Sequence, residues 1–67
     1  MKAATPDVSV ENHGSLFLFR LHSEAAREWV DANVPDDAQY FGGALAVEHR
    51  YAHDLAEGMQ ADGLALE

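Results

Sequence analysis

Hydrophobic and polar residues alternate near the start of the chain, and this pattern predicts a β-hairpin over residues 7–21. Val8 and Val10 are separated by a polar residue, the alternation that is typical of a half-buried strand. Residues 12–14 break the pattern and predict a three-residue turn whose glycine takes the left-handed conformation. Residues 16–21 are apolar on both faces, so we expect them to form either a central strand of a sheet or a strand with helices on one side and a partner on the other.

The next segment, from about Glu24 to Asn33, has the pattern of an amphipathic helix. Ser23 is a favourable N-cap residue, and Pro35 prevents the helix from continuing. The expected polar side, on which Arg27 is spaced to form an ion pair with Asp31, consists of Glu24, Arg27, Glu28 and Asp31. The expected apolar side, whose tryptophan should be substantially buried against the sheet, consists of Ala25, Ala26, Trp29, Val30 and Ala32.

The second half of the chain predicts another strand and another helix. Residues 44–48 alternate as a strand, whereas residues 39–41 fit either a short strand or an irregular segment. Gly42 and Gly43 between them fit either a tight hairpin turn or a bulge. A helix follows over about residues 50–62.

This second helix carries Tyr51, Leu55 and Met59 on one apolar stripe. Gly58 lies inside the helix, where glycine costs about 1 kcal/mol relative to alanine. We therefore expect Gly58 to permit close packing of the helix on the sheet. The sequence allows residues 64–67 to form a short last strand but does not require it.

These elements predict the α+β class, with a small mixed or antiparallel sheet and two helices. Their expected order is β-β-α-β-α, with a final β left open. We expect one domain over residues 7–67, preceded by a flexible tail over residues 1–6.

Composition narrows the functional classes. The 67 residues hold one domain, and a hydrophobic content of 48% is normal for a globular chain. The chain has no cysteine, which excludes disulfides and cysteine-based zinc sites and fits a reducing compartment. No apolar run approaches the about 18 residues of a membrane span, and the first residues lack the apolar core of a signal peptide. We therefore expect a cytoplasmic protein without a membrane partner.

Charge is the most unusual property of the sequence. Twelve acidic residues oppose four lysines and arginines, which gives a net charge of −8. Such a chain repels phosphate backbones, so direct nucleic-acid binding is not expected, whereas basic protein surfaces would attract it. The alternative is that the acidity only maintains solubility. The acidic residues that we expect to bind a basic partner are Glu24, Glu28, Asp31, Asp36, Asp37, Asp54 and Glu57.

Two neighbouring aromatic residues form a second candidate surface. Tyr40 and Phe41 precede the glycine pair, and aromatic side chains are enriched at the centres of protein interfaces. We expect Phe41 to fill the core instead, which leaves Tyr40 as the candidate for partner binding.

The residue types needed for catalysis or metal binding occur without a specific arrangement. His49 and His53 have the i, i+4 spacing that can place two imidazoles on one metal ion, but no third ligand is fixed by the sequence. We expect two solvated histidines there, and neither a metal nor another cofactor. No serine lies in a nucleophile elbow and no phosphate-binding loop is present, so we expect a protein that is not an enzyme.

Several segments resemble a family of small proteins from bacteria and their phages or prophages. The resemblance covers roughly Val8 to Leu64 and is carried by Glu11–Ser15, Ala25–Trp29, Asp37–Tyr51, Asp54–Met59 and Asp62–Leu64. In that family a proline often stands where His49 stands here, which argues against a metal site.

Size and acidity also resemble the anti-CRISPR proteins, many of which are short acidic chains that occupy DNA-binding sites on Cas proteins. This resemblance implies an inhibitor in the cytoplasm of a host cell. Its partner would be a basic nucleic-acid-binding protein such as a subunit of a type I CRISPR effector, and the chain would be a monomer or a weak homodimer. The alternative is a small self-associating accessory or regulatory protein, with the sheet or the aromatic segment as its interface.

Overall fold

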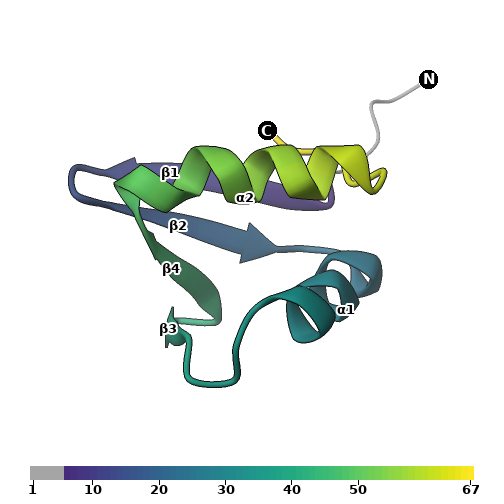
Figure 1. Cartoon of the computed structure of the whole chain (residues 1–67), viewed down its shortest axis with the longest axis horizontal. Coiled ribbons are helices and arrows are strands. Elements are labelled where there is room, and N and C mark those ends of the chain that lie inside the picture. The colour runs from purple at the N-terminus through teal and green to yellow at the C-terminus, as the bar shows by residue number, and fades with distance from the viewer. Residues whose placement is uncertain (1–5) are drawn as a thin grey trace.

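The computed structural model describes residues 6–67 and arranges them as a four-stranded antiparallel sheet with two helices (Figure 1). The elements in chain order are β1 (Val8–His13), β2 (Leu16–Leu21), α1 (Glu24–Asn33), β3 (Gln39–Phe41), β4 (Ala44–Glu48) and α2 (His49–Ala61). The α+β class is confirmed, and the order is β-β-α-β-β-α. Apart from Pro6, the expected tail over residues 1–6 lies outside the described residues.

The strands lie in the order β1-β2-β4-β3 across the sheet. β2 is therefore an inner strand, one of the two arrangements that its apolar faces predicted. The segment over residues 39–41 is a strand, β3, and it forms one edge of this sheet.

The first hairpin turns later than the sequence pattern predicted. β1 extends to His13, which pairs with Leu16, so the turn consists of Gly14 and Ser15. The expected three-residue loop is therefore wrong. Gly14 has φ +85°, which suits the first position of a two-residue hairpin turn, where glycine is favoured. The Asn12 side chain accepts a hydrogen bond of 2.9 Å from the Gly14 N–H and stabilises the turn from within the strand.

The glycine pair forms a tight hairpin turn and not a bulge. Gly42 and Gly43 have φ values of +57° and +83°, and Phe41 pairs directly with Ala44 across them. Two-residue turns with positive φ at both positions match the right-handed twist of the flanking strands. This turn fixes the register of β3 on β4.

Side chains alternate between the two faces of the sheet, and the helices cover only one of them. Phe19 of β2 is aligned with Val10 of β1 and Leu45 of β4, so these residues share a face. The core on this face is formed by Val8, Phe19, Ala26, Val30, Leu45, Ala52, Met59 and Leu64. Both helices contribute to it, and the opposite face has no helix packed on it within the described residues.

Helix α1 begins and ends close to the predicted positions. The Ser23 side chain accepts a hydrogen bond from the Ala26 N–H at 3.0 Å, which confirms it as the N-cap. The buried stripe of the helix is narrower than expected. Ala26 and Val30 are buried and Trp29 is partly buried, whereas Ala25 and Ala32 face solvent because they lie outside the arc that contacts the sheet.

Gly58 permits a close helix–helix contact and not the expected contact with the sheet. A Cβ atom added at Gly58 would lie 3.3 Å from Cζ2 of Trp29 in α1. The indole Nε1 of Trp29 also donates a hydrogen bond of 2.5 Å to Asp62, just after α2. Trp29 therefore bridges the two helices; it is partly buried and packs against the core as expected, but its ring also lies beside α2 and not only over the sheet.

The last residues lie beside β1. Leu66 forms an isolated parallel bridge with Val8, and Glu67 exchanges backbone hydrogen bonds with Val8 and Val10 at 3.0 and 2.9 Å. The last strand that the sequence left undecided is therefore a single β-bridge between Leu66 and Val8. Helix α2 begins at His49 and ends at Ala61, close to the expected 50–62.

Candidate protein-binding surfaces

Three acidic residues of α1 form a stripe that points away from the core. Glu24, Glu28 and Asp31 lie at positions i, i+4 and i+7, within an arc of about 60° on a regular helix. Ala26 and Val30 point in the opposite direction and are buried. All three carboxylates are exposed. We call these three residues the acidic stripe.

No ion pair within residues 6–67 involves the acidic stripe. The expected pair between Arg27 and Asp31 is not formed. The Arg27 guanidinium instead donates to the backbone carbonyl of Leu21 at 3.2 Å, back towards β2. The stripe therefore presents its negative charge to solvent without a paired cation from the described residues.

The other acidic candidates fall into two further places. Asp37 and Asp54 lie around a groove between the two helices. Glu57 lies on the outer side of α2, where it is 3.1 Å from His53. Asp36 is exposed in the turn after α1 but does not line the groove. The structure therefore does not gather the acidic residues predicted to bind a partner into one surface.

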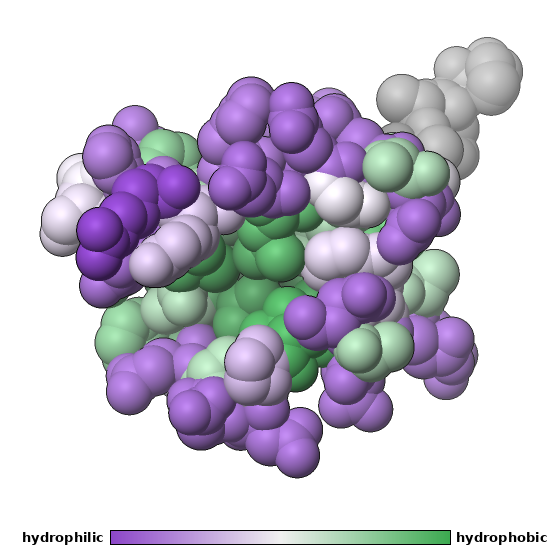
Figure 2. Space-filling view, viewed as in Figure 1, coloured by the Kyte–Doolittle hydropathy of each residue, from purple (hydrophilic) through white to green (hydrophobic). Residues whose placement is uncertain are grey.

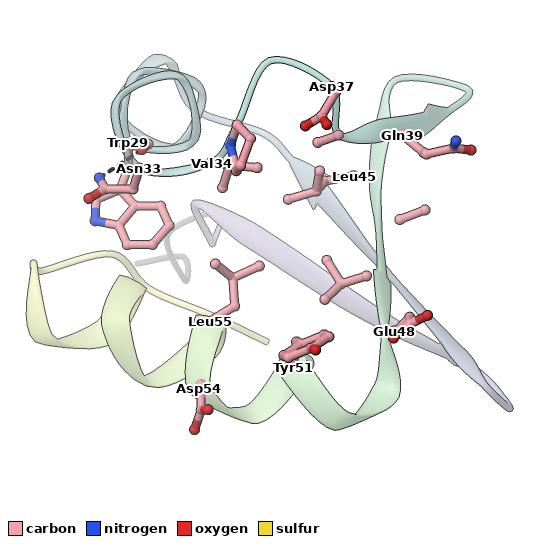
Figure 3. Close-up of a pocket in the computed structure, with 14 residues that line it drawn as sticks. Trp29, Asn33, Val34, Asp37, Gln39, Leu45, Glu48, Tyr51, Asp54 and Leu55 are labelled. Atoms are coloured by element: carbon pink, nitrogen blue, oxygen red, sulfur yellow. Dashed lines mark hydrogen bonds between the residues drawn. The ribbon is translucent and has the colours of Figure 1, made fainter.

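The groove between α1 and α2 has an apolar interior and a volume of about 820 Å³. Leu45 and Val47 of β4 and Leu55 of α2 form its floor, and Trp29 and Val34 form the wall on the α1 side. Figure 3 shows the side chains of Trp29, Val34, Leu45 and Leu55 around the same space. In the space-filling view the same region is a hydrophobic hollow surrounded by hydrophilic residues (Figure 2). Sequence patterns do not reveal this groove, because it is the space left between elements distant in the chain.

The edge of the groove is acidic. Asp37, Glu48 and Asp54 lie around it, and none of the described residues that line it is lysine, arginine or histidine. Tyr51, which the sequence assigned to the apolar stripe of α2, is 55% exposed at the groove edge. Arg50 lies just outside, with its guanidinium 5.2 Å from the centre of the Tyr51 ring and 3.4 Å from a Glu48 oxygen.

Tyr40 and Phe41 do not form one aromatic surface. Phe41 is 51% exposed, so the expectation that it fills the core is wrong, and Tyr40 is 47% exposed. Neighbouring residues of a strand point to opposite faces. Tyr40 is aligned with Leu45 on the helix-covered side, whereas Phe41 is aligned with Ala44 on the other side.

The helix-free face of the sheet carries apolar side chains and one strong ion pair. Leu16, Leu18 and Phe41 lie on it by strand register, and none of them packs against the core. Glu11 and Arg20 form an ion pair across this face at 2.6 Å. The helix-free face is therefore a third candidate surface.

The charge environment of Glu11 is unusual among the carboxylates. Hydrogen bonds from Arg20 and, to a smaller extent, from His13 lower the pKa of Glu11 from 4.5 to about 2. The pair with Glu11 also raises the pKa of Arg20. Glu11 is therefore a firmly ionised structural carboxylate.

His49 and His53 share one side of α2 at the i, i+4 spacing but gather no further ligand. The His49 ring lies 6.5 Å from the Phe17 ring, and His53 is paired with Glu57. No group of three or more histidine, aspartate or glutamate side chains suited to a metal ion occurs in residues 6–67.

The chain matches no protein-family model, no curated protein and no solved structure at a significant level. None of the helices in the described part of the chain is long and apolar enough to cross a membrane. Function must therefore be inferred from the three surfaces themselves.

Proposed function

We propose that this chain is a non-enzymatic inhibitor of phage or prophage origin. Its acidic stripe would occupy a basic nucleic-acid-binding site on a host Cas protein, as anti-CRISPR proteins do. The observation that carries the proposal is that Glu24, Glu28 and Asp31 point to solvent on one side of α1 and pair with no cation among residues 6–67. A chain of net charge −8 is attracted to such a site at long range.

The acidic stripe carries its charges in a row, although more widely spaced than the phosphates of one strand. With a rise of about 1.5 Å per residue, Glu24 and Glu28 are about 6 Å apart along the helix axis, and Glu28 and Asp31 about 4.5 Å. One strand of a duplex carries a charge about every 3.4 Å along its axis. The stripe would therefore pair with some of the lysines and arginines of such a site and not with each of them in turn.

The absence of cysteine supports action in the reducing cytoplasm of a host cell.

The test is a competition assay with a purified type I CRISPR surveillance complex and its target DNA. The wild-type chain should block DNA binding, and the block should weaken as salt rises, because exposed charges are screened over about 8 Å at physiological ionic strength. Glu28→Lys/Asp31→Lys should restore DNA binding. A matched control, Asp54→Lys/Glu57→Lys, makes the same charge change at the same spacing on α2 and should leave the block largely intact.

Both double variants must keep the circular dichroism spectrum and melting temperature of a folded chain for this comparison. Failure of the wild-type chain to compete would remove the inhibitor proposal. If both double variants lose the block of DNA binding equally, the net charge of the chain, and not the acidic stripe, causes the block.

The second candidate function is that of a self-associating accessory or regulatory protein. It is favoured by Leu16, Leu18 and Phe41, which lie on the helix-free face without packing on the core. Sedimentation equilibrium distinguishes the two functions. A stable dimer that resists salt and is lost in Leu18→Lys would favour this second function, whereas a monomer at all tested concentrations would leave only the first.

A further inference from the structure

The groove between α1 and α2 exists because the helices cover the sheet unevenly. Helix α2 lies over β2, where the His49 ring is 6.5 Å from the Phe17 ring and Ala52 and Met59 are buried in the core. Over β4 the helices leave a gap, and Val47 is only partly buried there. The apolar layer that a further helix would cover is thus open on this side of the sheet (Figure 2).

The α1 wall of the groove is held in place before any partner arrives. Trp29 is fixed by its hydrogen bond to Asp62, and its ring contacts Gly58 closely enough to restrict movement towards α2. A fixed aromatic wall loses little conformational entropy on binding. Apolar hollows with polar edges are characteristic of protein and ligand binding sites.

The charges at the groove edge define the chemistry of the occupant. Glu48 is offset by Arg50, but Asp37 and Asp54 take part in no ion pair within residues 6–67. A partner segment with an apolar side chain in the groove would meet these carboxylates beside it. Lysine or arginine next to that side chain would be attracted, and aspartate or glutamate would be repelled.

We propose that this groove binds an amphipathic basic helix of a partner protein, with aliphatic side chains on the partly buried Trp29, Val47 and Leu55 and basic side chains near Asp37 and Asp54. A helix suits the site because the hollow is bounded by α1 and α2 and is open to solvent along its length (Figure 2). The net charge of −8 argues against a second copy of the chain as the occupant.

This site is separate from the acidic stripe. Trp29 and Asn33 line the groove on the side of α1 that faces α2, whereas Glu24, Glu28 and Asp31 do not line it. The stripe and the groove can therefore be tested independently, and failure of one does not imply failure of the other.

The probe is a synthetic lysine–leucine peptide of about 15 residues, a length at which isolated helices begin to form. Its leucines follow the i, i+3, i+4, i+7 pattern. A peptide of identical composition with the leucines distributed around the helix is the control ligand. Binding is followed by amide and indole N–H chemical shifts of the full, isotope-labelled chain. The patterned peptide should bind saturably with a dissociation constant below about 1 mM. It should shift the Trp29 indole, Leu45, Val47 and Leu55 signals.

Matched variants separate the groove from general attraction. Asp37→Asn/Asp54→Asn should weaken binding about threefold to tenfold, which corresponds to two exposed charge pairs. Asp36→Asn/Glu57→Gln removes the same amount of charge from residues that do not line the groove and should change the affinity less than twofold. Tyr51→Ala should weaken binding at least about fivefold, as truncation of an interface aromatic does. Phe41→Ala, which replaces an exposed aromatic residue on the helix-free face, should leave the affinity unchanged.

Three results would overturn the proposal. They are the absence of saturable binding, equal binding of the two peptides, and shifts confined to residues outside the groove. Equal weakening in the two amide double variants would also overturn it, because the attraction would then come from the overall field of the chain. All of these variants replace exposed residues, and unchanged amide spectra in the free state confirm their fold.

Discussion

The Trp29 indole and the Asp62 carboxylate join α1 to the end of α2 by a hydrogen bond of 2.5 Å. These residues are 33 positions apart in the sequence. The bond keeps the indole along one wall of the groove. The same pair therefore contributes to the stability of the domain and to the shape of its candidate binding site.

Removal of either member of this pair should destabilise the domain. Trp29→Ala should cost about 2–3 kcal/mol, less than the about 3–5 typical of a fully buried large aromatic residue, because the ring is only partly buried. Asp62→Ala should cost about 0.5–1.5 kcal/mol, the net value of one hydrogen bond. Urea denaturation followed by circular dichroism measures both. If Asp62→Ala lowers the free energy of unfolding by the same amount in a Trp29→Phe background, the indole is not the donor to Asp62.

Gly58→Ala tests the contact between the helices. Alanine favours the helix by about 1 kcal/mol relative to glycine. Its Cβ would lie 3.3 Å from Cζ2 of Trp29, which is a tight contact with a ring that Asp62 holds in place. We expect the two effects to cancel in the wild-type background.

The same substitution should stabilise a chain in which the large ring is absent. In a Trp29→Leu background, Gly58→Ala should raise the free energy of unfolding by about 1 kcal/mol, because only the helix preference remains. Thermal and urea denaturation of the four chains form a double-mutant cycle. Equal effects in both backgrounds would show that Gly58 and Trp29 are not in contact.

Elements set by local patterns were predictable from the sequence. The Ser23 cap and Pro35 bound α1 correctly, and the two apolar faces of residues 16–21 indicated an inner strand as one of two arrangements. Details that depend on register were not predictable in the same way. Phe41 faces the helix-free side because the turn at Gly42 and Gly43 has two residues, and a shift by one residue would send it to the core.

The candidate sites show the same division. The acidic stripe follows from the helical spacing of Glu24, Glu28 and Asp31, so the sequence was sufficient to find it. The groove and the contact of Gly58 depend on where α1 comes to lie beside α2, and no local pattern encodes that placement. A glycine inside α2 predicted that another element packs closely on Gly58, but it did not predict that this element is α1.

Phe19 and Phe41 should respond very differently to truncation, although both are phenylalanines in strands. Phe19 is fully buried in the core, so Phe19→Ala should cost about 3–5 kcal/mol. Phe41 is 51% exposed and does not pack on the core, so Phe41→Ser should change stability by at most about 0.5 kcal/mol. Urea denaturation at low protein concentration is the measurement. A large cost for Phe41→Ser that grows with protein concentration would instead indicate that Phe41 is buried in a dimer.

The ion pair between Glu11 and Arg20 should make stability depend on pH in the acid range. The pKa of Glu11 is about 2 in the folded chain and near 4.5 without its partners. Because the folded value is the lower one, the pair contributes its full stabilisation above pH 4.5 and loses it as the pH falls towards 2. Arg20→Gln removes the main cause of this shift, so it should raise the pKa of Glu11 towards its ordinary value. His13→Asn should raise it less, since the hydrogen bond from His13 is the smaller cause.

Carboxyl carbon chemical shifts of Glu11, recorded between pH 1.5 and 7 in the three chains, measure these values directly. Urea denaturation at pH 3 and pH 7 tests the consequence for stability. The free energy of unfolding should differ less between these two pH values in Arg20→Gln than in the wild-type chain. The bond between Arg20 Nε and Glu11 at 2.6 Å lies across the helix-free face, where 43% and 40% of the two side chains are exposed. Salt should therefore weaken the pair and raise the pKa of Glu11 in the wild-type chain more than in Arg20→Gln. An unshifted Glu11 pKa in the wild-type chain would mean that the pair does not persist in solution.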